Sequence, residues 1–258
     1  MRSHDQPDDQ IGARQGQVWA CLSTVMDPEL DESVTELNFV THADVDAGNR
    51  VHIGFRLPTY WCAANFSYLM ADDMRRAVAV LDWVEGVEVT LGEHMYADKI
   101  NAGLAKGLSF QETFGDEADG EVEEIRRTFL VKAFQRRQSA ILSHLVAAGH
   151  SSGALAAMTI AELETLVLDD DGARLRQRYL DRRGVVGAGG PETRAFITSE
   201  GAKLTSESLP KYLSGLRRIS VNAEFNSALC RGLLAVRFDI ETPLRSRSCS
   251  APATIGAG

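Results

Sequence analysis

The clearest alternation of apolar and other side chains lies in residues 51–57, and its two-residue period predicts a half-buried β-strand. Pro58 follows directly and predicts the end of the strand, because proline has no backbone N–H to donate. Apolar side chains then recur at three- and four-residue steps, which predicts a helix over residues 64–83. Cys62 therefore lies where a strand gives way to a helix. Free backbone N–H groups and the helix dipole favour a thiolate at such a junction.

The residues before this strand predict a helix and a hairpin. A short apolar stripe that includes Cys21 predicts a helix, and Pro28 ends it because the residue before a proline avoids the helical region. Residues 33–45 are interpreted as a strand, and the turn at 46–49, which contains Gly and Asn, joins it to strand 51–57.

A third strand is predicted at residues 87–91, where Val and Leu alternate with Glu and Thr. Because a helix separates it from strand 51–57, we expect these two strands to be parallel neighbours joined by a crossover. Cys62 would then lie just past the carboxyl end of a strand, the edge at which sites in open α/β layers gather. A further helix is predicted over residues 97–108.

The second part of the chain is predicted to be mainly helical. An acidic, glycine-flanked break at residues 115–120 precedes it and predicts a domain boundary. An amphipathic pattern over residues 121–148, with glutamates in the first turn, predicts a long helix. Thr159 and Glu162 have the spacing of a capping box, and residues 207–237 are predicted to be mostly helix.

These patterns together predict an α/β (α+β) protein of two domains. A small helix–hairpin–helix–strand domain spans residues 14–114, and a mainly α-helical second domain spans residues 121–243. The polar start, residues 1–13, and the Ser-, Ala- and Gly-rich end, residues 244–258, are expected to be disordered.

Charge and cysteine usage narrow the class of protein. The net charge of −9 argues against general binding to nucleic acid or to anionic membranes. The first 120 residues carry 8 basic and 21 acidic side chains, whereas the remainder is net basic, which suggests that the two parts dock on each other or on different partners. The polar start does not resemble a signal peptide, no apolar run is long enough to span a membrane, and the four cysteines form no Cys-x-x-Cys motif. We therefore expect a cytoplasmic protein with free thiols.

The candidate site is centred on Cys62. Iron and zinc accept thiolate and carboxylate ligands, and Asp27 and Glu29, on either side of Pro28, are the nearest chemically suitable companions. Thr59 is expected to support the cysteine loop through a hydrogen bond to the backbone at the start of the following helix.

Each candidate also has a purely structural interpretation. Cys62 could be a small buried hydrophobe beside Trp61, and Asp27 could simply cap the turn in which it lies. Glu93 and His94 follow the third strand and could approach the same sheet edge as further ligands. A lone His at a strand end is more often an ordinary exposed side chain.

The pairing of Asp27-Pro28-Glu29 with Thr59-x-x-Cys62, about one hairpin later, resembles small metal–sulfur cluster assembly domains of the SufT and PaaD types. The order of predicted elements is similar as well, and the resemblance covers roughly residues 14–95. This chain has Ala63 where that family usually has a proline after the cysteine, so the shape of the loop is expected to differ.

The resemblance implies a non-catalytic maturation factor for iron–sulfur proteins. It implies that an iron–sulfur cluster or iron is held transiently, and that Cys62 is the main ligand. The implied partners are a client metalloenzyme, such as a multicomponent oxygenase, and the iron–sulfur assembly machinery. A homodimer is compatible with the sequence.

Two other classes of function stay open. A metal-free adaptor or chaperone is suggested by the opposite charge of the two parts and by the long helix at 121–148. A thiol-dependent enzyme would use Cys62 as nucleophile and would need a base, for which His94 is the candidate.

Overall fold

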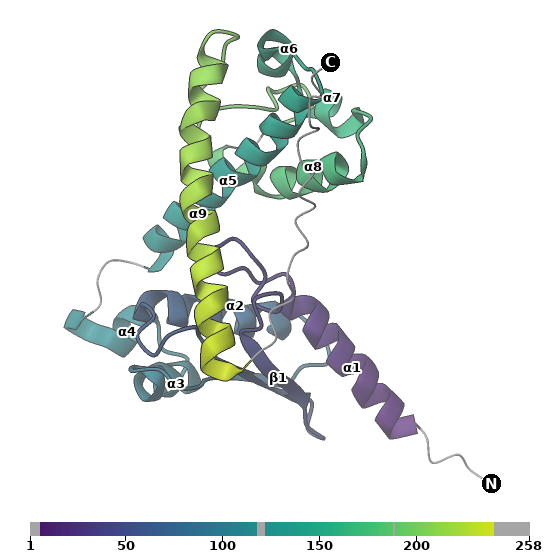
Figure 1. Ribbon diagram of the computed structural model, residues 1–258. Helices are drawn as coiled ribbons and strands as arrows, with labels where there is room; N and C mark the ends of the chain where they lie inside the picture. Colours follow the sequence, from purple (N-terminus) through teal and green to yellow (C-terminus); the bar gives the residue numbers. More distant parts are fainter. Residues whose placement is uncertain (1–5, 118–121, 188, 240–258) are drawn as a thin grey trace, which may run out of the picture.

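The computed structural model describes residues 6–117, 122–187 and 189–239 (Figure 1), so the expected disordered end at 244–258 lies outside the described residues. The elements of the first region are α1 (Gln6–Leu22), β1 (Val40–Val45), β2 (Arg50–Phe55), α2 (Ala64–Ala79), β3 (Gly86–Leu91), α3 (Ala97–Ala105), α4 (Phe110–Phe114) and the 3₁₀ turn η1 (Gly115–Glu117). The helical region contains α5 (Val122–Ala147), α6 (Ser152–Ala157), α7 (Ile160–Thr165), α8 (Asp170–Arg183), the 3₁₀ turn η2 (Gly184–Val186) and α9 (Ser208–Phe238). Among the described residues, no helix combines the length and the apolar character needed to cross a bilayer.

The sheet has three strands in the order β1-β2-β3. β2 is the middle strand, antiparallel to β1 and parallel to β3. The parallel pairing confirms the prediction for strands 51–57 and 87–91, and α2 forms the connection between them. The predicted α+β class, a small mixed domain followed by helices, is therefore correct.

Two boundaries in the first region differ from the sequence prediction. The strand predicted over residues 33–45 begins only at Val40, because the preceding residues form turns and Asn38 has a positive φ of 57°, which is incompatible with a strand. Of the residues 1–13 that were expected to be disordered, 1–5 lie outside the described residues, and the structure has α1 from Gln6 onward. A polar first turn can extend a helix whose later turns are held by packing, and Val18 and Leu22 of α1 are fully buried.

Buried apolar side chains form two clusters. The first surrounds the sheet and contains side chains of α1, α2 and all three strands, among them Val18, Ile53, Met74 and Val89. The second lies among α5 to α9 and contains Phe134, Leu142, Tyr179 and Phe196.

Helix α9 belongs to both clusters. Its Leu209, Leu213 and Leu216 are buried in the second cluster, and its Leu234 is buried in the first. With 31 residues the helix is about 46 Å long, and Figure 1 shows it running from the helical region, beside α5, down to the region of the sheet. The part of the chain predicted as a separate helical domain therefore supplies a side chain to the core of the first domain.

Candidate functional site

The loop that carries Cys62 connects β2 to α2. Pro58 is buried at its start, whereas Trp61 is 72% exposed. The hydroxyl Oγ1 of Thr59 lies 3.1 Å from Cys62 Sγ, so threonine contacts the sulfur itself, a closer link than the expected bond to the backbone. Cys62 is half-buried against the first cluster and lies two residues before α2 begins.

His94 fastens this loop from the adjacent strand end. The structure contradicts the expectation of an exposed histidine, because the residue is 4% exposed. Its Nε2 lies 2.7 Å from the carbonyl oxygen of Cys62, and its Nδ1 accepts a hydrogen bond from the backbone N–H of Tyr96 at 3.1 Å. Because Nδ1 is the acceptor, the ring proton is on Nε2, which donates to Cys62.

The environment of His94 favours a neutral ring that forms hydrogen bonds with backbone groups. Burial lowers its pKa, the hydrogen bond to the carbonyl of Cys62 opposes this, and the charge of Arg237 lowers the pKa further. Both ring nitrogens are engaged by backbone groups. The ring therefore positions the cysteine loop, and this geometry does not leave it available as the base of a thiol enzyme.

Asp27-Pro28-Glu29 forms a turn in which Asp27 is the organising side chain. Its Oδ1 accepts hydrogen bonds from the backbone N–H groups of Glu29 (2.9 Å) and Leu30 (2.7 Å). The side chain is 8% exposed, and burial raises its pKa to about 6 although the two hydrogen bonds act in the opposite direction. The geometry thus gives Asp27 the capping role that was considered as an alternative to metal ligation.

The second half of α9 lies across both loops. Asn226 Nδ2 donates to Glu29 Oε1 at 3.0 Å. Further along the helix, Arg237 donates to the carbonyl oxygens of Leu57 (3.2 Å) and Glu93 (3.0 Å) and to Glu93 Oε2 (3.1 Å). Glu93 is thus an ion-pair partner of α9, at the sheet edge where sequence analysis placed it.

Cys230 of α9 lies between these contacts. Burial, together with the negative charges of Asp27, Cys62 and Glu29, raises the pKa of its thiol to about 11. The three residues predicted to act together are therefore the electrostatic neighbours of a fourth side chain that sequence analysis had left unassigned. The only sequence signal for Cys230 is its place in a predicted helix. The local sequence pattern does not indicate that this helix packs against the region of the sheet.

The donor groups at this site do not amount to a complete metal cage. Within the described ranges, no group of three or more His, Cys, Asp or Glu side chains is arranged to hold a metal ion. The predicted set of Cys62, Asp27 and Glu29 therefore does not form a ready-made site in this arrangement. What the arrangement offers is two thiols in an acidic environment.

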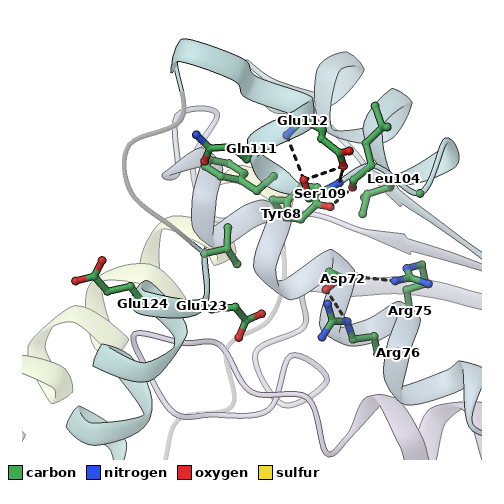
Figure 2. A pocket seen from close by; sticks show the side chains of 14 residues that line it. Tyr68, Asp72, Arg75, Arg76, Leu104, Ser109, Gln111, Glu112, Glu123 and Glu124 are labelled. Carbon is green, nitrogen blue, oxygen red and sulfur yellow. Dashed lines mark hydrogen bonds and ion pairs between the residues drawn. The ribbon is translucent and has the colours of Figure 1, made fainter.

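A separate hollow of about 890 Å³ lies between α2, α4 and the start of α5 (Figure 2). Its charged walls are largely paired: Asp72 binds Arg75 and Arg76 at 2.8 and 2.7 Å, and Ser109 and Glu112 form a capping box. None of the predicted site residues lines this hollow. We therefore assign the site to the cysteine loop.

The comparisons with known proteins concern the small α+β region that carries the cysteine loop after its middle strand. Residues 15–91 match the family model described as "Iron-sulfur cluster assembly protein". The match covers the second half of α1, the β1–β2 hairpin, the cysteine loop, α2 and β3, and it ends before the helical region.

A solved structure also matches part of the chain. It is the crystal structure of a domain of unknown function, DUF59, from Bacillus anthracis, with 18% sequence identity and a TM-score of 0.31. The alignment covers 38% of this chain and 97% of that one. No curated protein matches the chain.

Proposed function

We propose that this protein is a maturation factor that accepts iron or an iron–sulfur cluster at Cys62 and passes it to a client metalloenzyme, in the manner of SufT- and PaaD-type proteins. The observation that carries the proposal is the loop of Cys62, which lies inside the segment that matches an iron–sulfur assembly family. A multicomponent oxygenase is a fitting client. The free thiols favour a reducing compartment such as the cytoplasm.

The geometry suits a carrier better than a storage site. Iron and iron–sulfur clusters bind thiolates strongly, and a fully protein-ligated ion would leave slowly. Cys62 is half-buried, and its loop is fixed by Thr59 and His94. The sulfur is thus held in position, while part of the coordination of the cargo is left for other donors.

The test uses the full chain in an anaerobic reconstitution with ferrous iron and sulfide. Cys62→Ser should reduce the bound iron and sulfide to near background, and it should prevent activation of an apo-client. Circular dichroism of the variant should be unchanged, because the side chain is only half-buried and serine is similar in size.

Cys21→Ser is the matched control for this experiment, since Cys21 is another free thiol packed against the same cluster. It should bind as much iron as the parent protein. Equal loading of the Cys62→Ser variant and the parent would refute the proposed function.

A metal-free adaptor is the second candidate, and one observation favours it. The face of α9 that points away from the first cluster carries exposed apolar side chains at helical spacing, namely Val221, Phe225, Leu229, Leu233 and Val236. An adaptor that binds a partner there would tolerate Cys62→Ser with its activity intact. The same substitution therefore separates the two candidates.

A further inference from the structure

The second half of α9 presents one narrow face to the cysteine loop and the acidic turn. Asn226, Cys230, Leu234 and Arg237 fall within an arc of about 80° at 3.6 residues per turn. Asn226 binds Glu29, and the side chain of Leu234 is buried in the first cluster. Cys230, one helical turn from each, therefore points toward the sheet as they do.

The contacts of Arg237 fix the other end of this face. Its guanidinium donates to the carbonyl of Leu57, the residue before Pro58, and to Glu93, the residue before His94. Both bonds hold α9 against the two segments that carry and fasten the cysteine loop. Cys230 is thus held between a contact to the acidic turn and a contact to the loop base.

Cys62 and Cys230 both lie where the second half of α9 packs against the first region. Both are half-buried against the first cluster, and the hydrogen bonds of Asn226 and Arg237 hold this stretch of α9 between the turn of Glu29 and the base of the Cys62 loop. Asp27 and Glu29 act on the thiol of Cys230 and add negative charge. A cation bound by both sulfurs would be attracted by these carboxylates.

We propose that Cys230 is a second thiolate ligand for the cargo, so that iron or a cluster is bound between the Cys62 loop and α9. The proposal rests on the proposed function and extends it to a residue outside the segment that matches the family model. On binding, each S–H bond is replaced by a sulfur–metal bond and the two protons go to solvent, with no change in oxidation state. Sulfide or donors of the client complete the coordination.

Cobalt(II) is a direct probe, because the intensity of its sulfur-to-metal charge-transfer absorption increases with the number of thiolates bound. The experiment uses the reduced full chain carrying Cys21→Ser and Cys249→Ser, in which Cys62 and Cys230 are the remaining cysteines. Titration under anaerobic conditions should give an intensity typical of two thiolates. Adding Cys230→Ser should lower it to about half and weaken cobalt binding roughly tenfold or more.

A second measurement reports proximity without metal. Dibromobimane becomes strongly fluorescent when it bridges two thiols, so the two-cysteine protein should give a signal that either single replacement removes. Cys230→Ala serves as a second variant in case serine at this half-buried position disturbs the helix.

The outcomes separate this proposal from the one on which it rests. If Cys62→Ser loses cobalt while Cys230→Ser and Cys230→Ala keep the full intensity, Cys230 is not a ligand and the proposed function survives. If neither cysteine affects cobalt binding or iron loading, both proposals are overturned. Loss of intensity at each cysteine, together with bimane bridging, supports the two-thiolate site.

Discussion

Asp27 shows how burial can outweigh hydrogen bonding at a single residue. Two backbone N–H groups stabilise its carboxylate, yet its pKa is raised from 3.8 to about 6 because the side chain is removed from water. The folded state therefore favours the protonated form. The stability that the protonated carboxyl group of Asp27 contributes to the folded state is fully present below about pH 4. It is lost as the pH rises through 6.

Asp27→Asn should therefore stabilise the protein at neutral pH, because the amide keeps an oxygen for the turn and carries no charge. A shift of this size corresponds to at most about 3 kcal/mol. We expect the free energy of unfolding, measured by urea denaturation, to exceed that of the parent at pH 7.5 and to equal it at pH 4.

Asp46→Asn is the control for this comparison. Its carboxylate is exposed, and a hydrogen bond from the backbone of Arg50 lowers its pKa, so the substitution should not stabilise at pH 7.5. A gain for Asp27→Asn that is the same at both pH values would contradict the explanation by titration.

Local pattern predicts some features of the site and not others. The position of Cys62 after a strand and before a helix follows from alternation, Pro58 and helical spacing, all of which are short-range signals. The burial of His94 depends on the loop of Cys62, about 30 residues away in sequence, and was therefore missed. Cys230 was missed for the same reason, since nothing in its own helix indicates which core it meets.

At the scale of elements, the starts of the helices are the features that the sequence predicts most clearly. The capping box at Thr159 and Glu162 is present as predicted, and α5 begins at Val122 with two glutamates in its first turn. Strand β1 was predicted too long, because the apolar residues before it alternate for a different reason: Leu37 and Phe39 are buried from a turn. An alternating pattern of apolar residues indicates which side chains are buried. A turn that packs on the core can produce this pattern as well as a strand can.

Arg237 determines how firmly the end of α9 is held at the site. Arg237→Ala removes donors to Leu57 and Glu93 and should free the last turns of the helix. Hydrogen bonds to a charged group contribute about 1.5–3 kcal/mol, so local opening should become roughly tenfold more frequent or more. Hydrogen exchange of residues 230–238 and the rate of modification of Cys230 should both rise.

Arg217→Ala is the matched control, since Arg217 lies on the same helix and contacts Ser143 of α5 at 3.5 Å. It should leave both rates unchanged. Equal rates for Arg237→Ala and the parent would show that the buried side chain of Leu234 alone holds the helix end in place.

At the scale of the whole molecule, a buried ion pair joins the two regions. Asp31, in the loop before the sheet, binds Nε and Nη2 of Arg137 on α5 at 2.7 Å, and both side chains are buried. The backbone carbonyl of Asp31 also accepts a hydrogen bond from Arg178 of α8. Removing one partner of a buried pair leaves the other charge without compensation.

Asp31→Asn should therefore lower the free energy of unfolding by roughly 3 kcal/mol. The three tryptophans, Trp19, Trp61 and Trp83, all lie in the first region, so their fluorescence follows its unfolding, whereas circular dichroism follows both regions. Because α9 contributes to both clusters, we expect the two signals to change together during urea denaturation of the parent protein.

Asp171→Asn is the comparison for this variant, because Asp171 and Arg174 form an ion pair that is exposed to solvent. It should change the stability by less than about 1 kcal/mol. Similar losses for the two variants would show that burial of the Asp31–Arg137 pair is unimportant.

The continuity of α9 has a consequence for the spacing of the two sulfurs. One end of this single helix is seated among α5 and its neighbours, and the other end carries Cys230 to the Cys62 loop. A helix of this kind moves as a rod over short distances, so the gap between the two cysteines depends on how the helical core is seated. A protein that binds the first half of α9, away from Cys230, could widen or narrow that gap without touching either thiol.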